Sequence, residues 1–60
     1  MTRLKEIREE KGISQRELAK RINISAPRYN QYENNKRSLP PKIALLLAKE
    51  LNVTIDEIYR

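Results

Sequence analysis

The charge around residues 25–34 is unusual for a helix. Ser25 can cap the amino end of a helix that reaches about Asn34, and Pro27 suits its first turn, where a missing N–H costs little. The same turn carries Arg28 and no acid, although the positive end of the helix dipole normally favours Asp or Glu. Such an end favours an external anion, for example a phosphate or the electronegative edge of guanine. The plainer alternative is a short surface helix that merely lacks an acid.

Little else in the sequence could do chemistry. The 60 residues include no His and no Cys, which removes the commonest general base, the commonest metal ligand and the nucleophile arrangements built on them. Two acidic pairs, Glu9-Glu10 and Asp56-Glu57, are expected on exposed helical faces without a companion base. We therefore predict that the protein is not an enzyme and has no cofactor and no metal site.

The positive charge is concentrated in the middle of the chain. The formal net charge of +5 favours a polyanionic partner, either nucleic acid or acidic lipid. Residues 25–42 contain four basic side chains and one acidic side chain, whereas residues 43–60 are slightly acidic. No apolar run approaches the roughly 18 residues that a membrane span requires. The middle of the chain is therefore the expected binding region.

Capping residues, Pro, Gly and Asn predict five short helices, and no stretch shows the sustained alternation of a strand. Ser14-Glu17 and Thr54-Glu57 have the spacing of a capping box. Four residues stand where a left-handed backbone is expected: Gly12, Asn23, Asn35 and Asn52. The helices are expected to begin at Thr2, Ser14, Ser25, Pro40-Pro41 and Thr54, and the first four to end near Gly12, Asn23, Asn34 and Leu51.

None of these helices could bury its apolar residues alone, so the fold class is predicted to be all-α, with five helices around one core. A chain this short buries only about 60% of its unfolded surface, so it needs efficient packing or a partner subunit. The predicted core consists of Leu4, Ile7, Ile13, Leu18, Ala19, Ile22, Ile24, Tyr29, Tyr32, Ala44, Leu47, Ala48, Leu51, Val53, Ile55 and Ile58.

The second and third helices are joined only by Asn23-Ile24-Ser25. So short a link cannot lay two helices antiparallel, and it forces them to cross steeply. The outline is that of a helix-turn-helix.

Residues 4–58 resemble the Cro/C1-type (XRE) helix-turn-helix family of phage and bacterial regulators. The resemblance implies a compact, lambda-repressor-like DNA-binding domain of five helices over residues 1–60, with the helix-turn-helix at helices 2 and 3. Relatives usually have Gly where this chain has Asn23, Asn35 and Asn52. The resemblance is carried by Leu4, Arg8, Lys11-Gly12-Ile13-Ser14-Gln15, Glu17-Leu18-Ala19, Ile24-Ser25, Tyr32-Glu33-Asn34-Asn35-Lys36-Arg37, Leu47-Ala48-Lys49-Glu50-Leu51 and Val53-Thr54-Ile55-Asp56-Glu57-Ile58.

The resemblance also assigns roles to individual residues. Helix 3 would lie in the major groove, where Arg28 could pair with guanine and Gln31 with adenine. Gln15 would bind phosphate and brace helix 3, and Arg8 with Glu33 would form a partly buried ion pair. The chain departs from the family at Pro27 and at Leu39-Pro40-Pro41. The base-reading positions would be Ser25, Ala26, Pro27, Arg28, Asn30 and Gln31. The phosphate-positioning residues would be Ser14, Gln15, Arg16, Asn34, Lys36 and Arg37.

Each assignment has a plainer alternative. The polar residues of helix 3, Gln15 and the pair Lys36-Arg37 could be ordinary solvated residues. For Arg16, with Lys20 and Arg21, a solvated face is the favoured interpretation. Tyr29 and Tyr32 could stack on bases as in single-strand binders, but their spacing of three residues favours the core.

The function that these features predict is sequence-specific binding of double-stranded DNA by a cytoplasmic bacterial or phage transcriptional regulator, with a repressor favoured. The expected partner is a palindromic operator, and we expect no small-molecule ligand in this domain. The alternative is a protein-interaction module of the same fold, such as an antitoxin or antirepressor partner, which Ala26-Pro27 modestly favours. A membrane-surface binder fits poorly, because no helix combines a wide basic face with bulky aromatic anchors.

A homodimer is expected to form through the C-terminal third. The six consecutive apolar residues 43–48 cover more than one face of a helix, so Leu45 or Leu46 is directed partly outward. Ile55 and Tyr59 add to this surplus, and an apolar patch on a small domain usually marks an interface. The predicted dimer residues are Leu45, Leu46, Ile55 and Tyr59. The alternative is that both leucines lie in a fuller core.

Overall fold

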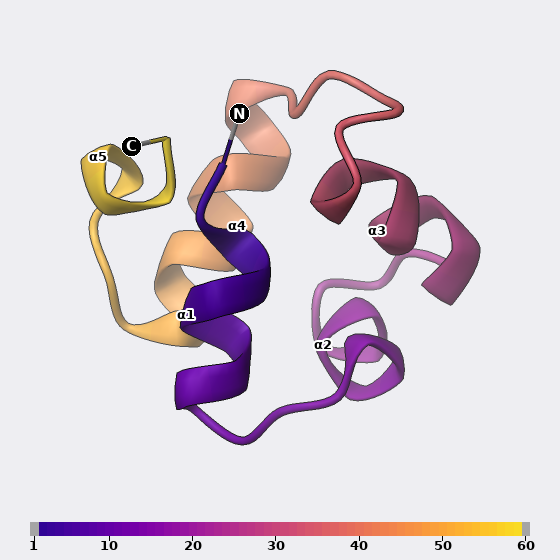
Figure 1. Cartoon of the computed structure of the whole chain (residues 1–60), viewed down its shortest axis with the longest axis horizontal. Helices are drawn as coiled ribbons and strands as arrows, with labels where there is room; N and C mark the ends of the chain where they lie inside the picture. Colours follow the sequence, from indigo (N-terminus) through magenta and orange to yellow (C-terminus); the bar gives the residue numbers. More distant parts are fainter. Residues whose placement is uncertain (1, 60) are drawn as a thin grey trace.

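Five α-helices make up most of residues 2–59, the part of the chain that the structure, a computed structural model, describes (Figure 1). No strand occurs within these residues, so the predicted all-α fold of five helices is confirmed. None of the helices is long and apolar enough to cross a lipid bilayer. The helices are α1 (Leu4–Glu10), α2 (Gln15–Arg21), α3 (Ala26–Glu33), α4 (Pro41–Leu51) and α5 (Ile55–Ile58).

The first four helices end in the same way, with a residue in the left-handed conformation. After α2, the N–H of Ile24 donates to the carbonyl of Ala19 at 3.0 Å, across the left-handed Asn23. This closure satisfies a carbonyl that the end of a helix would otherwise leave free. Asn is the side chain that tolerates this conformation best after Gly, so the prediction for the three asparagines is confirmed. The left-handed residues are Gly12 (φ 68°), Asn23 (φ 62°), Asn35 (φ 59°) and Asn52 (φ 55°).

Side-chain caps open three of the helices. The hydroxyl oxygens of Ser14 and Ser25 accept the backbone N–H three residues ahead, at 3.0 and 3.2 Å. At the start of α5, Thr54 and Glu57 form the full predicted capping box. Pro40 and Pro41 open α4 without a side-chain cap, which Pro tolerates because it has no N–H to satisfy.

Two predicted caps were wrong. Arg3, not Thr2, stands at the N-cap position of α1, and it makes no side-chain cap bond. The predicted capping box at Ser14 is only half formed, because the carboxylate of Glu17 accepts from Arg21 at 3.2 Å instead of returning to the backbone. An oppositely charged side chain one turn away competes for the carboxylate.

The core lies where α1 and α4 occupy the middle of the molecule, with α5 on one side and α2 and α3 on the other (Figure 1). Its two largest buried side chains are Tyr29 and Tyr32, which confirms that both belong to the core. Ile55 was wrongly predicted to be buried, since 37% of it is exposed. Leu39 and Ile43, absent from the predicted core, pack against it partly buried. The buried apolar residues are Leu4, Ile7, Leu18, Ala19, Ile22, Tyr29, Tyr32, Ala44, Leu47, Ala48, Leu51 and Ile58.

Candidate nucleic-acid interface

The amino end of α3 is open to solvent. Ser25, Pro27 and Arg28 are exposed there, Ala26 is half-buried against the core, and the first turn holds no acidic residue. Ser25 has an extended backbone (φ −73°, ψ 152°), and its hydroxyl accepts the N–H of Arg28. The positive end of the α3 dipole therefore faces solvent without a neutralising carboxylate.

The position of α3 is fixed by an ion pair with α1. Nε of Arg8 donates to Oε2 of Glu33 at 2.6 Å, and NH2 of Arg8 donates to Oε1 at 3.3 Å. NH1 of the same guanidinium donates to the carbonyl of Ile13 at 2.7 Å. Only 11% of the Arg8 side chain and 1% of the Glu33 side chain are exposed. One arginine thus joins α1, the connection to α2, and the last turn of α3.

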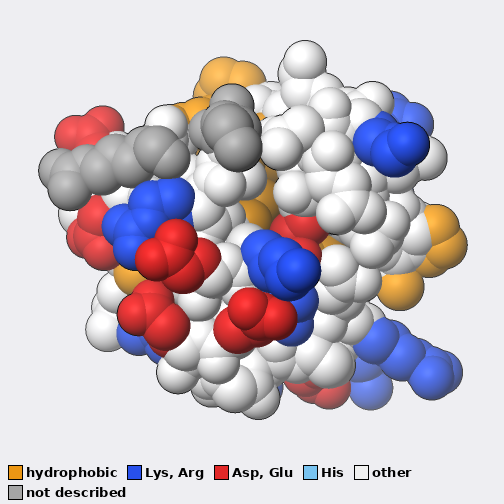
Figure 2. Space-filling model, in the orientation of Figure 1, with side chains coloured by type: hydrophobic (Ala, Val, Ile, Leu, Met, Phe, Trp, Pro, Cys, Tyr) orange, Lys and Arg blue, Asp and Glu red, His pale blue; other side chains and the backbone are white. Residues whose placement is uncertain are grey.

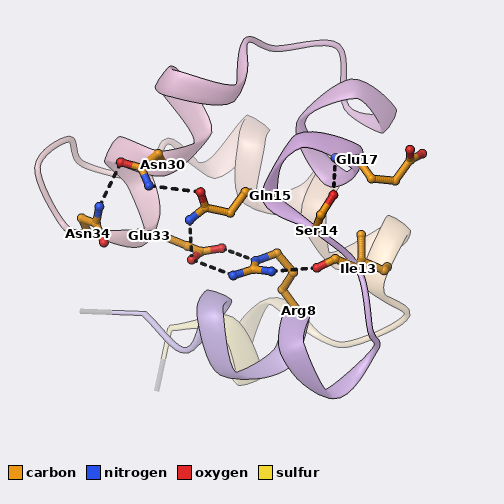
Figure 3. Close-up of polar contacts among 8 residues, drawn as sticks. All are labelled: Arg8, Ile13, Ser14, Gln15, Glu17, Asn30, Glu33 and Asn34. Atoms are coloured by element: carbon orange, nitrogen blue, oxygen red, sulfur yellow. Dashed lines mark hydrogen bonds and ion pairs between the residues drawn. The ribbon is translucent and has the colours of Figure 1, made fainter.

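A chain of hydrogen bonds continues from this ion pair to the surface (Figure 3). Nε2 of Gln15, the first residue of α2, donates to Oε1 of Glu33 at 3.0 Å. Oε1 of Gln15 accepts from Nδ2 of Asn30 at 3.1 Å, and Oδ1 of Asn30 accepts from Nδ2 of Asn34 at 3.0 Å. Gln15 therefore braces α3 through both ends of its amide, and the amide of Asn30 is engaged within the protein.

The surroundings of Glu33 keep its carboxylate ionised. Burial alone would raise the pKa of Glu33, but hydrogen bonds from Arg8 and Gln15 outweigh this effect and hold the pKa below its ordinary value. The hydrogen bond with Glu33 in turn raises the pKa of Arg8. Burial and the nearby Glu33 carboxylate also raise the pKa of Tyr29, whose buried hydroxyl has no hydrogen-bond partner within residues 2–59. The pair is therefore fully charged at neutral pH.

The outer side chains of α3 and of the turn after it are also paired. Arg28 donates from Nε to the hydroxyl of Tyr32 at 3.1 Å, and Oε1 of Gln31 accepts from Nε of Arg37 at 3.0 Å. The backbone N–H groups of Lys36 and Arg37 both donate to the carbonyl of Gln31, at 2.9 and 3.3 Å. These two N–H groups are thus used within the fold, so Lys36 and Arg37 can meet an external anion only through their exposed side chains.

Acidic side chains are unevenly distributed over one face of the molecule. In the view of Figure 2 they gather over the left and lower parts, where α1 and α5 lie. The right edge, where Figure 1 places α2 and α3, carries basic and apolar side chains. On the face that Figure 2 shows, the side of α2 and α3 therefore suits a polyanion better than the side of α1 and α5.

The sequence-predicted residues fall into two separate groups. The predicted base-reading and phosphate-positioning residues lie together on α2, on α3 and in the turns beside them. Ser14 is the N-cap of α2, and Arg16 is exposed. The predicted dimer residues lie instead on α4, on α5 and at its end, and all four are exposed. Sequence reasoning missed the bond between Arg28 and the Tyr32 hydroxyl, although the spacing of four residues on a helix brings such side chains together.

Comparison with known proteins matches the chain from the first residue of α1 to the last residue of α5. Residues 4–58 match the model of a helix-turn-helix family. The chain is 36% identical over 56 residues to the propionyl-CoA carboxylase regulator of Cereibacter sphaeroides, covering 93% of this chain and 12% of that protein. It is 35% identical over 52 residues to the HTH-type transcriptional regulator PrpR of Mycobacterium tuberculosis, covering 87% of this chain and 11% of that one. The chain thus spans only about an eighth of the length of these relatives.

Removing the Glu33 carboxylate should lower the stability of the fold substantially. In Glu33→Ala the Arg8 guanidinium stays largely buried without its partner, so the free energy of unfolding should fall by about 3–5 kcal/mol in urea titrations. Glu6→Ala is the control, because it breaks the exposed Arg3–Glu6 pair and should change little. Equal small losses in the two variants would show that the Arg8–Glu33 pair is not buried in solution.

The same pair predicts a pH dependence. Since the pKa of Glu33 is lowered by folding, its contribution to stability is present above the ordinary Glu pKa of 4.5 and is lost as the pH falls through the lower folded value. Between about pH 5 and pH 3, the unfolding free energy of the parent should therefore fall more steeply than that of Glu33→Gln. Identical slopes in urea titrations across this range would contradict the lowered pKa.

Proposed function

The chain belongs to this helix-turn-helix family, and on that premise we propose that it binds double-stranded DNA and regulates transcription. The observation that carries the proposal is the open, acid-free amino end of α3. The carboxyl-terminal half of the same helix is held against α1 by the Arg8–Glu33 pair and against α2 by Gln15. The two relatives are named as regulators, which agrees with this function. We further propose that residues 1–60 form one DNA-binding domain and that the protein acts in this domain as a binder, not as an enzyme.

In this proposal α3 lies in the major groove with its amino end toward the bases. Arg28 and Gln31 are the main base readers, because both are exposed and their side chains suit guanine and adenine, respectively. Gln31 would exchange its exposed bond from Arg37 for the adenine edge, whereas Arg28 can keep the bond from its Nε to Tyr32 and offer its terminal nitrogens. Pro27 and Ala26 supply apolar contacts, for example to a thymine methyl group. Ser25 and Asn30 have side chains already engaged within the protein, so they contribute to reading mainly by shaping the face that the DNA meets.

A second set of residues would hold the phosphates and fix the register of α3 in the groove. Gln15, at the amino end of α2, suits a backbone phosphate while it braces α3. Lys36 and Arg37 extend the contact from the turn after α3, where both are exposed. The proposed phosphate-positioning set is Ser14, Gln15, Arg16, Asn34, Lys36 and Arg37.

We also propose that the protein binds a palindromic operator as a homodimer and acts as a repressor. Four exposed apolar side chains support the dimer: Leu45 (47% exposed), Leu46 (37%), Ile55 (37%) and Tyr59 (42%). They lie on elements other than the helix-turn-helix, so a dimer formed through them would leave both copies of α3 free for half-sites about 34 Å apart. So few side chains support only a weak interface, and much of the pairing would then occur on the operator.

The DNA-binding proposal predicts a division between reading and positioning residues. On a site selected from a random duplex pool, Arg28→Ala and Gln31→Ala should each cost about 1–3 kcal/mol and relax the preference at one base pair. Lys36→Ala should weaken binding to all sequences about equally, since it loses a phosphate contact.

For the parent, a dimer that neutralises about 6–10 phosphates should lose roughly 10³–10⁵ in affinity between about 50 and 200 mM salt.

Gel shifts and fluorescence anisotropy on the selected site measure both effects. Full base preference in Arg28→Ala would remove Arg28 as a reader. An affinity for duplex DNA that does not change with salt would contradict the proposed function itself, because phosphate contacts always release counterions.

The dimer proposal predicts a loss of cooperativity when the apolar side chains are replaced. The double variant Leu46→Lys with Tyr59→Ala should remain monomeric at concentrations where the parent associates, and it should bind a full palindrome little better than a half-site. Glu50→Gln is the control, since it lies exposed on the same helix and adds the same unit of charge without removing apolar surface. Undiminished cooperativity in a folded double variant, measured by sedimentation and gel shift, would place the interface elsewhere.

A further inference from the structure

Two tyrosines of α3 are buried to the same degree but differ in what their hydroxyls do. Tyr29 and Tyr32 are 0% and 1% exposed. The Tyr29 hydroxyl lies near the Arg8–Glu33 pair and has no hydrogen-bond partner within the described residues. The Tyr32 hydroxyl instead accepts from Nε of Arg28 at 3.1 Å. The hydroxyl of Tyr32 is therefore an internal anchor for a side chain that points to solvent.

The ring of Tyr32 adds to this contact. The guanidinium carbon of Arg28 lies 5.9 Å from the centroid of the ring, near the outer limit of an attractive cation–π interaction. Because the residues are one helical turn apart, both contacts form within α3, and the packing of Tyr32 in the core fixes the ring and hydroxyl that Arg28 meets. An exposed arginine would otherwise sample many rotamers.

The geometry of the bond leaves the reading atoms of Arg28 available. An arginine pairs with guanine through two N–H groups directed at O6 and N7. Since Nε donates to the Tyr32 hydroxyl, the two terminal nitrogens can point away from the helix toward an external acceptor. A guanidinium held in this way has already lost part of its conformational freedom, so less entropy is lost when it binds the DNA.

We propose that Tyr32 is a positioning residue that determines specificity: its hydroxyl and ring hold Arg28 in the orientation in which Arg28 reads a base. The inference rests on the proposed DNA-binding function and adds to it a residue that itself touches no DNA. The phenolic hydroxyl is the essential group, because the ring alone contacts the guanidinium only at long range.

The test compares Tyr32→Phe with Tyr29→Phe in the full chain. Each variant loses one buried hydroxyl from the same helix, but only the first removes a partner of Arg28. In the free protein, ¹⁵N relaxation of the Arg28 Nε–H group should show a rigid side chain in the parent and in Tyr29→Phe, and a mobile one in Tyr32→Phe. An equally rigid Arg28 in all three proteins would overturn the proposal without any DNA present.

Binding to the selected duplex provides the second measurement. Tyr32→Phe should lose about 2- to 10-fold in affinity, the ordering cost of one side chain, with the loss confined to the base pair that Arg28 reads. Tyr29→Phe should keep the parent's preference at the base pair that Arg28 reads, and any loss from its contact with the Arg8–Glu33 pair should be uniform across sequences. In an Arg28→Ala background, Tyr32→Phe should cause no further loss, because the residue that it positions is gone. A further loss of the same size there would assign Tyr32 a merely structural role and overturn the proposal.

The outcomes also separate this inference from the function on which it rests. If the parent binds duplex DNA with a preference that depends on Arg28, but Tyr32→Phe keeps that preference in full, only the role of Tyr32 is wrong. If the parent shows no affinity for duplex DNA, the proposed function fails, and the role of Tyr32 in specificity fails with it.

Discussion

The buried ion pair between Arg8 and Glu33 is the interaction on which the arrangement of the other helices depends. It joins α1 to the last turn of α3, and the same guanidinium holds the carbonyl of Ile13 in the connection between α1 and α2. Transferring two charges out of water is costly, and their attraction repays that cost only when the geometry is good and the remaining hydrogen bonds are made. Here a bidentate contact, a backbone carbonyl and the amide of Gln15 meet that condition. We infer that the pair sets the orientation of α3 more than it adds to stability.

This constraint explains how α3 can keep an amino end without an acid. A short helix normally gains from a carboxylate in its first turn, which α3 lacks. Its opposite end is fixed by Glu33, and its middle by the bond between Asn30 and Gln15. The polar contacts with other helices are therefore made by the carboxyl-terminal half of α3. Its amino-terminal turn is capped by Ser25 and exposed to solvent. That division of α3 into a held end and an open end is what the proposed binding of an external anion requires.

The sequence was most informative where a residue type has one dominant local role. Asn23, Asn35 and Asn52 were predicted from the steric cost of a left-handed backbone, the cap at Ser25 from its residue type with Pro27 close behind, and the cap at Thr54 from the spacing of Glu57. Prediction failed where two local partners compete or where burial depends on the tertiary arrangement. The carboxylate of Glu17 pairs with Arg21 one turn later, and Arg3 instead of Thr2 occupies the N-cap position of α1. Ile55 faces outward because a four-residue helix can bury only part of its surface. The hydroxyl of Tyr32 was missed because burial of an aromatic ring says nothing about what its hydroxyl meets.

The claim that the ion pair orients α3 can be tested without reference to any ligand. In the double variant Arg8→Met with Glu33→Leu, apolar side chains of similar size replace both charges, so neither is left unpaired. Residual dipolar couplings of backbone amides would measure the angle between α1 and α3 in the parent and in the variant, with α4 as the internal reference. We expect a folded variant of nearly parental stability in which α3 is reoriented or mobile relative to α1. A variant whose couplings place α3 at the parental angle, with parental rigidity, would contradict it.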